Sequence, residues 1–188
     1  MFILKFNSVY LYSIKQTNKY LIPKSPADKS EEQNCNCKEL NQNCSDNNCL
    51  NRATFHECSS KCPLSNECKN RRMANRENAK CQPVRSPLHG WGLVAQESIK
   101  KHSFVIEYVG EVIDQTECER RIQETTKSTY YFLTLDSQSI IDAGPKGNLA
   151  RFMNHSCEPN CIAEKWMVNG LPRVGLFALR DIEVGMFL

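Results

Sequence analysis

The residues best suited to chemistry lie in one short stretch, residues 151–161, which reads R-F-M-N-H-S-C-E-P-N-C. Its Asn and Pro-Asn positions are typical of turns. Hydrogen-bond donors, acceptors and one possible metal ligand lie close together in it: Arg151, Asn154, His155 and Cys157. The stretch is too polar for a core strand, so it indicates either a functional loop or a surface turn beside a buried thiol.

A second concentration of reactive side chains is a cysteine cluster. The chain has 11 cysteines, an odd number, and most of them fall within residues 35–68. A disulfide framework normally needs an even number and an oxidising compartment, whereas an intracellular metal site needs neither. Spacings such as C-x-C and C-x₃-C bring thiolates around one metal ion at little cost in loop closure. The clustered residues are Cys35, Cys37, Cys44, Cys49, Cys58, Cys62 and Cys68.

The number of thiols suggests how metal would be bound. Zinc takes four ligands in a closed structural site, and seven thiols fill eight ligand positions if one thiolate bridges two ions. We therefore predict a two-zinc cluster that holds a fold and has no open position for catalysis. Because this region has few apolar residues, its folding should depend on metal. His56 could replace a thiol, whereas Cys81 falls outside the spacing.

Residues 1–34 precede the cluster and carry no chemical motif. The first residues, M-F-I-L-K-F-N-S-V-Y-L, lack the basic region and cleavage site of a signal peptide, and they are too short to span a bilayer. We expect a disordered leader over 1–34, with linker composition at 24–33, and no membrane association. The alternative, a signal peptide, would make the cysteines extracellular.

Charge is weakly informative for the whole chain, because the formal net charge is only +3. A basic segment nevertheless follows the cysteines, and only Glu77 offsets it. This segment is either a solvated face or a contact for DNA phosphates, which would add affinity without sequence selectivity. Its members are Lys69, Arg71, Arg72, Arg76, Lys80 and Arg85.

The elements that position these residues are expected to be short strands. Cys118 and Ile122 lie four residues apart among charges, which predicts one short helix over 115–124, and residues 148–153 could add a helical turn. Many short strands with few helices predict a mainly β fold of small curled sheets. Runs rich in Val, Ile, Phe and Tyr predict strands at 93–96, 104–113, 130–135, 139–142 and 173–179.

Together these motifs resemble the SET-domain lysine methyltransferases. Residues 151–161 match the central signature of that family, and the cysteine spacing resembles the AWS (associated with SET) module. The segments Y-V-G-E-V-I-D and I-D-A-G-P-K-G-N are most similar in sequence to the nuclear receptor-binding SET-domain (NSD) family. The resemblance implies an AWS zinc module at 35–84 and a SET domain at 85–188. Further segments occur in the family's order: H-G-W-G-L at 89–93, E-Y-V-G-E-V-I at 107–113, Y-Y-F-L-T-L-D at 130–136, I-D-A-G-P-K-G-N at 141–148, W-x-V-N-G at 166–170 and R-V-G-L-F-A at 173–178.

The resemblance implies a SET fold, with small sheets around a pseudoknot-type C-terminal segment. It also implies metal ligands. One zinc ion would be held by Cys35, Cys37, Cys44 and Cys49. The other would be held by Cys44, Cys58, Cys62 and Cys68. A third zinc would use Cys157 together with post-SET cysteines.

An S-adenosylmethionine (SAM) site is implied as well. Glycines flanking Trp91 would let the backbone approach the cofactor closely, and Asn154 and His155 would meet its adenosine part. Without the resemblance, His155 could be a core histidine and Tyr131 a core aromatic. The residues implied to contact SAM are Gly90, Trp91, Gly92, Leu93, Ser128, Thr129, Tyr130, Tyr131, Asn154 and His155.

Methyl transfer from SAM mainly requires orientation and a dry site, because the sulfonium is already a good leaving group. The lysine amine must be neutral to attack, which an apolar aromatic channel favours. Tyr131 is the expected channel wall, and Arg151 and Asn154 would hold the surrounding loops. The implied function is a nuclear, SAM-dependent histone-lysine N-methyltransferase that acts on lysine 36 of histone H3 in nucleosomes. The alternatives are a non-catalytic chromatin module that binds a histone tail and an inert zinc domain.

The sequence departs from the family pattern near residue 188. The family continues with G-T/S-E-L-T-F-x-Y and C-x-C-x₄-C, whereas this sequence reads G-M-F-L at 185–188, with Phe187 where the family has Glu. The resemblance therefore implies that the closing tyrosine and the other ligands of a third zinc are missing. We interpret the sequence as a fragment rather than an inactive relative, and expect these 188 residues alone to have little or no activity.

Overall fold

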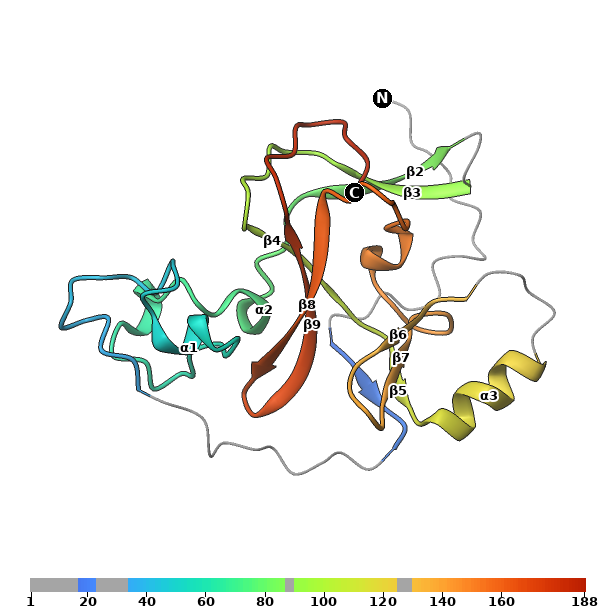
Figure 1. The fold of residues 1–188 in the computed structure, drawn as a ribbon, viewed down its shortest axis with the longest axis horizontal. Helices are drawn as coiled ribbons and strands as arrows, with labels where there is room; N and C mark the ends of the chain where they lie inside the picture. The colour runs from blue at the N-terminus through green and yellow to red at the C-terminus, as the bar shows by residue number, and fades with distance from the viewer. Residues whose placement is uncertain (1–16, 23–33, 87–89, 125–129) are drawn as a thin grey trace. The chain divides into compact units, whose positions relative to one another are not determined.

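The computed structural model describes residues 17–22, 34–86, 90–124 and 130–188 (Figure 1). Short strands dominate it and helices are few, which confirms the predicted mainly β fold. The chain forms two compact units. The first unit is Met1–Pro23 with Tyr108–Arg151, and the second unit is Lys24–Glu107 with Phe152–Leu188.

The first unit contains a four-stranded sheet in the order β1-β5-β7-β6. β1 pairs with β5 in parallel, and β7 pairs with both β5 and β6 in antiparallel fashion. All three residues of β5 are buried, and its Val112 pairs with the buried Ile141 of β7. The strands are β1 (Lys19–Tyr20), β5 (Glu111–Ile113), β6 (Phe132–Thr134) and β7 (Ile140–Asp142).

The only longer helix among the described residues, α3 (Gln115–Glu124), has the predicted bounds. It begins after Asp114, whose side chain accepts the backbone N–H of Glu117 at 2.8 Å and so satisfies one free donor of the first turn. Of the predicted apolar pair, Cys118 is buried and Ile122 is exposed. Helix α3 therefore has a narrow apolar contact, and charged side chains must contribute to its attachment. A short 3₁₀ helix, η2, spans Leu149–Phe152.

The second unit contains a three-stranded sheet and a two-stranded sheet. In the first of these, β9 (Leu171–Ala178) lies between β4 (Phe104–Tyr108) and β8 (Cys161–Val168). In the other, β2 (Cys81–Ser86) pairs with β3 (Gly90–Ala95). The β8–β9 hairpin turns at Asn169-Gly170, where both residues have positive φ, as the favoured two-residue hairpin turn requires.

The structure corrects the predicted strand at 104–113. The chain is divided there into β4 and β5, and residues 109–110 lie outside both strands. At Gly110, a Cβ atom would lie 2.4 Å from the backbone oxygen of Asp142. Only glycine permits this close approach between backbones. The glycine in E-Y-V-G-E-V-I therefore marks a tight crossing inside the first unit.

The cysteine region of the second unit has little regular structure: α1 (Leu50–Ala53), the 3₁₀ helix η1 (Ser65–Glu67) and α2 (Arg72–Asn75). Residues 55–57 extend along the edge of β8. His56 forms a parallel bridge with Met167, and the N–H of Met167 donates to the carbonyl of Phe55 at 2.8 Å. The N–H of Glu57 donates back to the carbonyl of Met167 at 2.9 Å. The cysteine region is thus hydrogen-bonded to this sheet.

Residues 17–22 belong to the segment expected to be a disordered leader, and within them Lys19–Tyr20 forms β1. Residues 1–16 and 23–33 of that segment lie outside the described residues. In the part of the chain that the structure describes, no helix is both long enough and apolar enough to cross a membrane.

Candidate functional site

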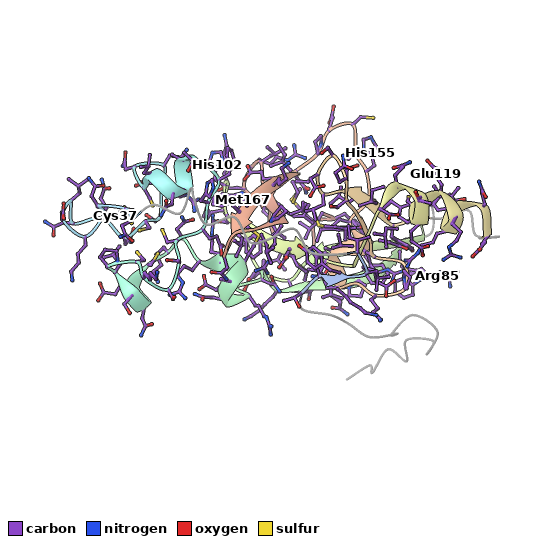
Figure 2. All side chains as sticks on the ribbon, turned by 90° about the horizontal axis from the view of Figure 1, so that it is seen from below. Cys37, Arg85, His102, Glu119, His155 and Met167 are labelled. Carbon is purple, nitrogen blue, oxygen red and sulfur yellow. The ribbon has the colours of Figure 1, made fainter. Side chains whose placement is uncertain are left out.

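The clustered thiols form a site that can hold metal ions. All seven of these cysteines are buried, and sulfur atoms gather in the module that contains Cys37 (Figure 2). Sulfur–sulfur distances are 3.6 Å for Cys35 and Cys44, 3.9 Å for Cys35 and Cys62, and 3.8 Å for Cys49 and Cys58. Zinc–sulfur bonds of about 2.3 Å place tetrahedral ligands about 3.8 Å apart. A disulfide would instead bring sulfurs to about 2.05 Å.

Two groups of thiols converge within 4.8 Å. One group is Cys35, Cys37, Cys44 and Cys49, which is the set implied for one zinc ion. The other is Cys35, Cys44, Cys58 and Cys62, so it contains Cys35 where the resemblance implied Cys68. The thiol of Cys68 instead hydrogen-bonds to Cys58. Cys35 and Cys44 belong to both groups and are therefore the candidates for shared ligands.

The thiols of this cluster differ in their electrostatic surroundings. Burial raises the pKa of the Cys44 and Cys49 thiols, because a thiolate is poorly solvated there. Cys58 differs, because hydrogen bonds from Cys68 and from the buried amides of Asn51 and Asn70 hold its pKa below the usual range. These amides lie 3.5 Å and 3.4 Å from its sulfur. A divalent cation would stabilise thiolates at the other positions too.

The other possible metal ligands lie apart from this cluster. Nδ1 of His56 lies 2.8 Å from the carbonyl oxygen of Thr54, and His56 is in neither thiol group. Cys157 is exposed, and Cys81 is half-buried. Among these possible ligands, the clustered cysteines are the ones placed so that they could hold a metal ion.

The G-W-G loop opens strand β3 in the second unit. Gly90 has φ +72°, and no atom lies within 4 Å of where its Cβ would be. The Asn154 side chain donates to the carbonyl oxygen of Trp91 at 3.2 Å, so two segments that the sequence predicted to share a site are in contact. His155 is exposed beside it. Leu93 is fully buried, so its side chain lies in the core.

In the first unit, Tyr131 is held through its backbone and its ring. Its carbonyl oxygen accepts the Tyr108 hydroxyl at 2.9 Å and the Ala143 N–H at 3.0 Å. The guanidinium carbon of Arg151 lies 4.1 Å from its ring centre. Arg151 also donates to the carbonyl of Gly144 at 3.0 Å. These contacts fix the orientation of the aromatic side chain expected to form a channel wall.

Tyr130 and Phe132 flank Tyr131 in the sequence. Tyr130 is exposed and stacks on Phe132, with ring centres 5.8 Å apart. Ser128 and Thr129 lie outside the described residues. Sequence reasoning missed Tyr108, whose hydroxyl is buried enough that its pKa is raised. A tyrosine at the end of an apolar strand gives no signal of this contact.

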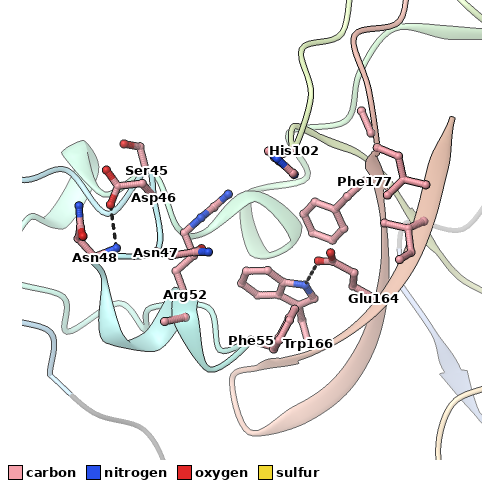
Figure 3. A pocket seen from close by; sticks show the side chains of 14 residues that line it. Ser45, Asp46, Asn47, Asn48, Arg52, Phe55, His102, Glu164, Trp166 and Phe177 are labelled. Atoms are coloured by element: carbon pink, nitrogen blue, oxygen red, sulfur yellow. Dashed lines mark hydrogen bonds between the residues drawn. The ribbon is translucent and has the colours of Figure 1, made fainter.

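A hollow of about 720 Å³ lies elsewhere in the second unit (Figure 3). Arg52 and Phe55 line it from the cysteine region, and Glu164 and Trp166 line it from strand β8. The Trp166 indole donates to Glu164 at 2.9 Å, while the Arg52 guanidinium lies 5.9 Å from the Trp166 ring centre. None of the predicted catalytic or cofactor residues that the structure describes lines this hollow.

Comparison with known proteins agrees with these features. Residues 90–186 match the SET domain and residues 32–76 match the AWS domain. The chain therefore belongs to the SET-domain family of protein-lysine methyltransferases, and it carries the AWS domain that the sequence predicted.

Several relatives are similar over most of the chain. A human "Histone-lysine N-methyltransferase, H3 lysine-36 specific" is 50% identical over 165 residues, which are 85% of this chain and 6% of the relative. Mouse NSD3 is 49% identical over 168 residues, or 86% of this chain and 12% of the relative. Mouse SETD2 is 45% identical over 140 residues, or 73% of this chain and 6% of the relative. The chain thus spans a small part of these proteins.

Proposed function

We propose that this chain is the catalytic region of a SAM-dependent histone-lysine N-methyltransferase. Its substrate would be lysine 36 of histone H3 in nucleosomes, and its location would be nuclear chromatin. The observation that carries the proposal is 50% identity over 85% of the chain to a relative named for that activity. The paired AWS and SET matches support it.

The residues present fit SAM. The space in front of Gly90 would admit a ligand against the backbone, and Asn154 holds the adjoining Trp91 carbonyl in place. Exposed His155 could face the adenosine part. When bound, the cofactor supplies a methyl group on a sulfonium that needs no further activation. The role of this chain is therefore to bind and orient.

Tyr131 and Arg151 would act on the substrate side. The aromatic ring of Tyr131 offers an apolar wall, which disfavours a lysine ammonium and favours the neutral amine. Arg151 stacks on that ring and so keeps it in place. Tyr131 and Arg151 would thus help to hold the neutral lysine amine in line with the methyl group that bound SAM would supply, and the methylated amine would lose its proton to water. Tyr131, Asn154 and Arg151 are the residues we propose for orientation.

Two structural zinc ions in the cysteine region complete the proposal, with an AWS module at 35–84 and a SET domain at 85–188.

Within the basic segment, Arg72 lies 5.1 Å from the Phe177 ring centre, and Lys80 pairs with Glu97 at 3.9 Å. The exposed members are thus better placed for DNA phosphates than Arg72. These exposed members are Lys69, Arg76, Lys80 and Arg85.

The test is methyl transfer from radiolabelled SAM to recombinant nucleosomes. It would use the 188-residue chain and the same chain extended by the segment that follows in an NSD3-type relative. We expect transfer by the extended protein, its loss on Tyr131→Ala, and none to nucleosomes with alanine in place of lysine 36. Equal transfer to the altered nucleosomes would contradict the assigned lysine. Histone-tail binding without transfer to any histone would support the non-catalytic alternative.

A further inference from the structure

Phe187 lies beside strand β3 and is fixed there by its backbone. It forms an antiparallel bridge with Val94, and the N–H of Leu188 donates to the carbonyl of Leu93 at 2.9 Å. The Asn160 side chain donates to the Phe187 carbonyl at 2.7 Å. The direction of the Phe187 side chain is therefore set by its neighbours.

That direction places the phenyl ring on the G-W-G loop. A Cβ atom built on Gly92 would lie 2.7 Å and 2.8 Å from two ring carbons of Phe187. The Nδ2 atom of Asn154 lies 3.4 Å from the same point. Gly92, Asn154 and Phe187 thus meet at one place, and glycine is what lets the ring come so close.

The contacts with Gly92 and Asn154 do not cover Phe187 completely, because 49% of the residue remains exposed. Beside this apolar surface lie Asn154 and exposed His155, which carry hydrogen-bonding groups. A flat ligand with an aromatic face and a polar edge matches this combination. The purine of SAM has these properties, since aromatic rings stack on its face while amides or imidazoles pair with its edge.

We propose that the Phe187 ring is part of the cofactor site and stacks on the purine of SAM. This inference rests on the proposed function. It goes beyond the family resemblance, which implies Glu rather than Phe at this position. The ring gives this chain an aromatic contact that a carboxylate does not provide.

The test is calorimetric binding of S-adenosylhomocysteine, which has the same purine, to the 188-residue chain. Phe187→Ala should weaken binding about tenfold, since a stacked aromatic pair contributes about as much as a tenfold change in affinity. Phe187→Leu keeps apolar packing on Gly92 but lacks an aromatic face, so it should also weaken binding. Phe187→Tyr should not. Phe55→Ala is a matched control, because Phe55 is also 49% exposed but lies in the cysteine region.

A spectroscopic readout separates stacking from packing. In Phe187→Trp, S-adenosylhomocysteine should quench the added tryptophan emission beyond the change seen in the native chain. Unchanged or tighter binding by Phe187→Ala and Phe187→Leu would overturn the inference and leave the proposed function standing. If the native chain, folded by the criterion of its zinc content, does not bind the ligand, the cofactor part of the proposed function falls and the inference falls with it.

Discussion

Glu117 lies in the first turn of α3, where its carboxylate is hydrogen-bonded to two arginines of the same helix. It accepts hydrogen bonds from Nε of Arg120 at 2.7 Å and from Nε of Arg121 at 2.8 Å. The bonds from Arg120, and then those from Arg121, lower the pKa of Glu117 to about 2. Its place at the helix N-terminus adds in the same direction, because a negative charge there interacts favourably with the helix dipole.

A pH titration should reveal this carboxylate directly. In an unfolded chain its pKa is about 4.3. The stabilisation that Glu117 provides should be present above that pH and should be lost as the pH falls through about 2. We expect carboxyl ¹³C NMR to give a midpoint near pH 2 for Glu117. Arg120→Gln should raise this midpoint, and a native midpoint at the ordinary value would contradict the arrangement.

Single residues also show what the sequence could predict about the site. The contact between Asn154 and the Trp91 carbonyl joins two motifs that the resemblance placed in one cofactor site. Tyr108 and Phe187 were not predicted as site residues, because their contacts depend on where another segment passes. The hydroxyl of Tyr108 reaches a carbonyl 23 residues later in the chain. A local sequence pattern does not show which residues 23 positions apart will be in contact.

At the scale of elements, the sequence predicted secondary structure correctly where local residues determine it. Helix α3 matches its predicted range, because its capping residue and charge pattern are local. Strand β8 was not predicted, since its exposed Ile162, Ala163 and Lys165 interrupt any clear alternation. It exists because the Asn169-Gly170 turn pairs it with the more apolar β9.

The attachment of α3 to the sheet of the first unit depends on Arg121. Its guanidinium contacts Glu111 at 3.0 Å and Asp142 at 2.6 Å. The side chains of these carboxylates are 8% and 7% exposed. Helix α3 offers little apolar surface, so this ion network replaces a hydrophobic stripe. Lys146 approaches Glu111 at 3.3 Å and completes the network.

Removing Arg121 should therefore destabilise the protein strongly. Arg121→Met leaves two buried carboxylates without their main partner, and we expect a loss of about 3 kcal/mol in the free energy of unfolding. Urea denaturation followed by circular dichroism would measure it. Arg120→Met is the matched control, because Arg120 is its neighbour on the same helix and its side chain is 52% exposed. Equal effects of the two substitutions would contradict the assigned role.

At the scale of the molecule, polar contacts of the second unit join its cysteine region to its three-stranded sheet. Within the cysteine region, buried Glu57 accepts the N–H groups of Met73 and Ala74 at 2.7 Å and 2.9 Å. Arg173 of strand β9 donates to the Met73 carbonyl at 3.2 Å and pairs with buried Glu107. The cysteine region and the sheet therefore share one set of buried charges.

Trp166 is the aromatic centre of this junction. It stacks on Phe177, with ring centres 5.4 Å apart and planes inclined by 23°, and Phe55 meets it edge-on at 5.6 Å. Arg52 and Arg72 each lie 5.9 Å from its ring centre. Three of these four neighbours come from the cysteine region, so the burial of Trp166, which is 4% exposed, depends on the fold of that region.

Removal of metal from the cysteine region should therefore change the environment of Trp166 on strand β8. Chelation would leave buried thiols without a cation, and we expect residues 34–76 to unfold, because this region has little apolar core besides its cysteines. Residues 55–57 would then leave the edge of β8 and expose Trp166. In a Trp91→Phe variant, tryptophan emission should shift to longer wavelength as zinc is released to a colorimetric chelator. Complete release of metal with unchanged emission would show that the sheet holds Trp166 without the cysteine region.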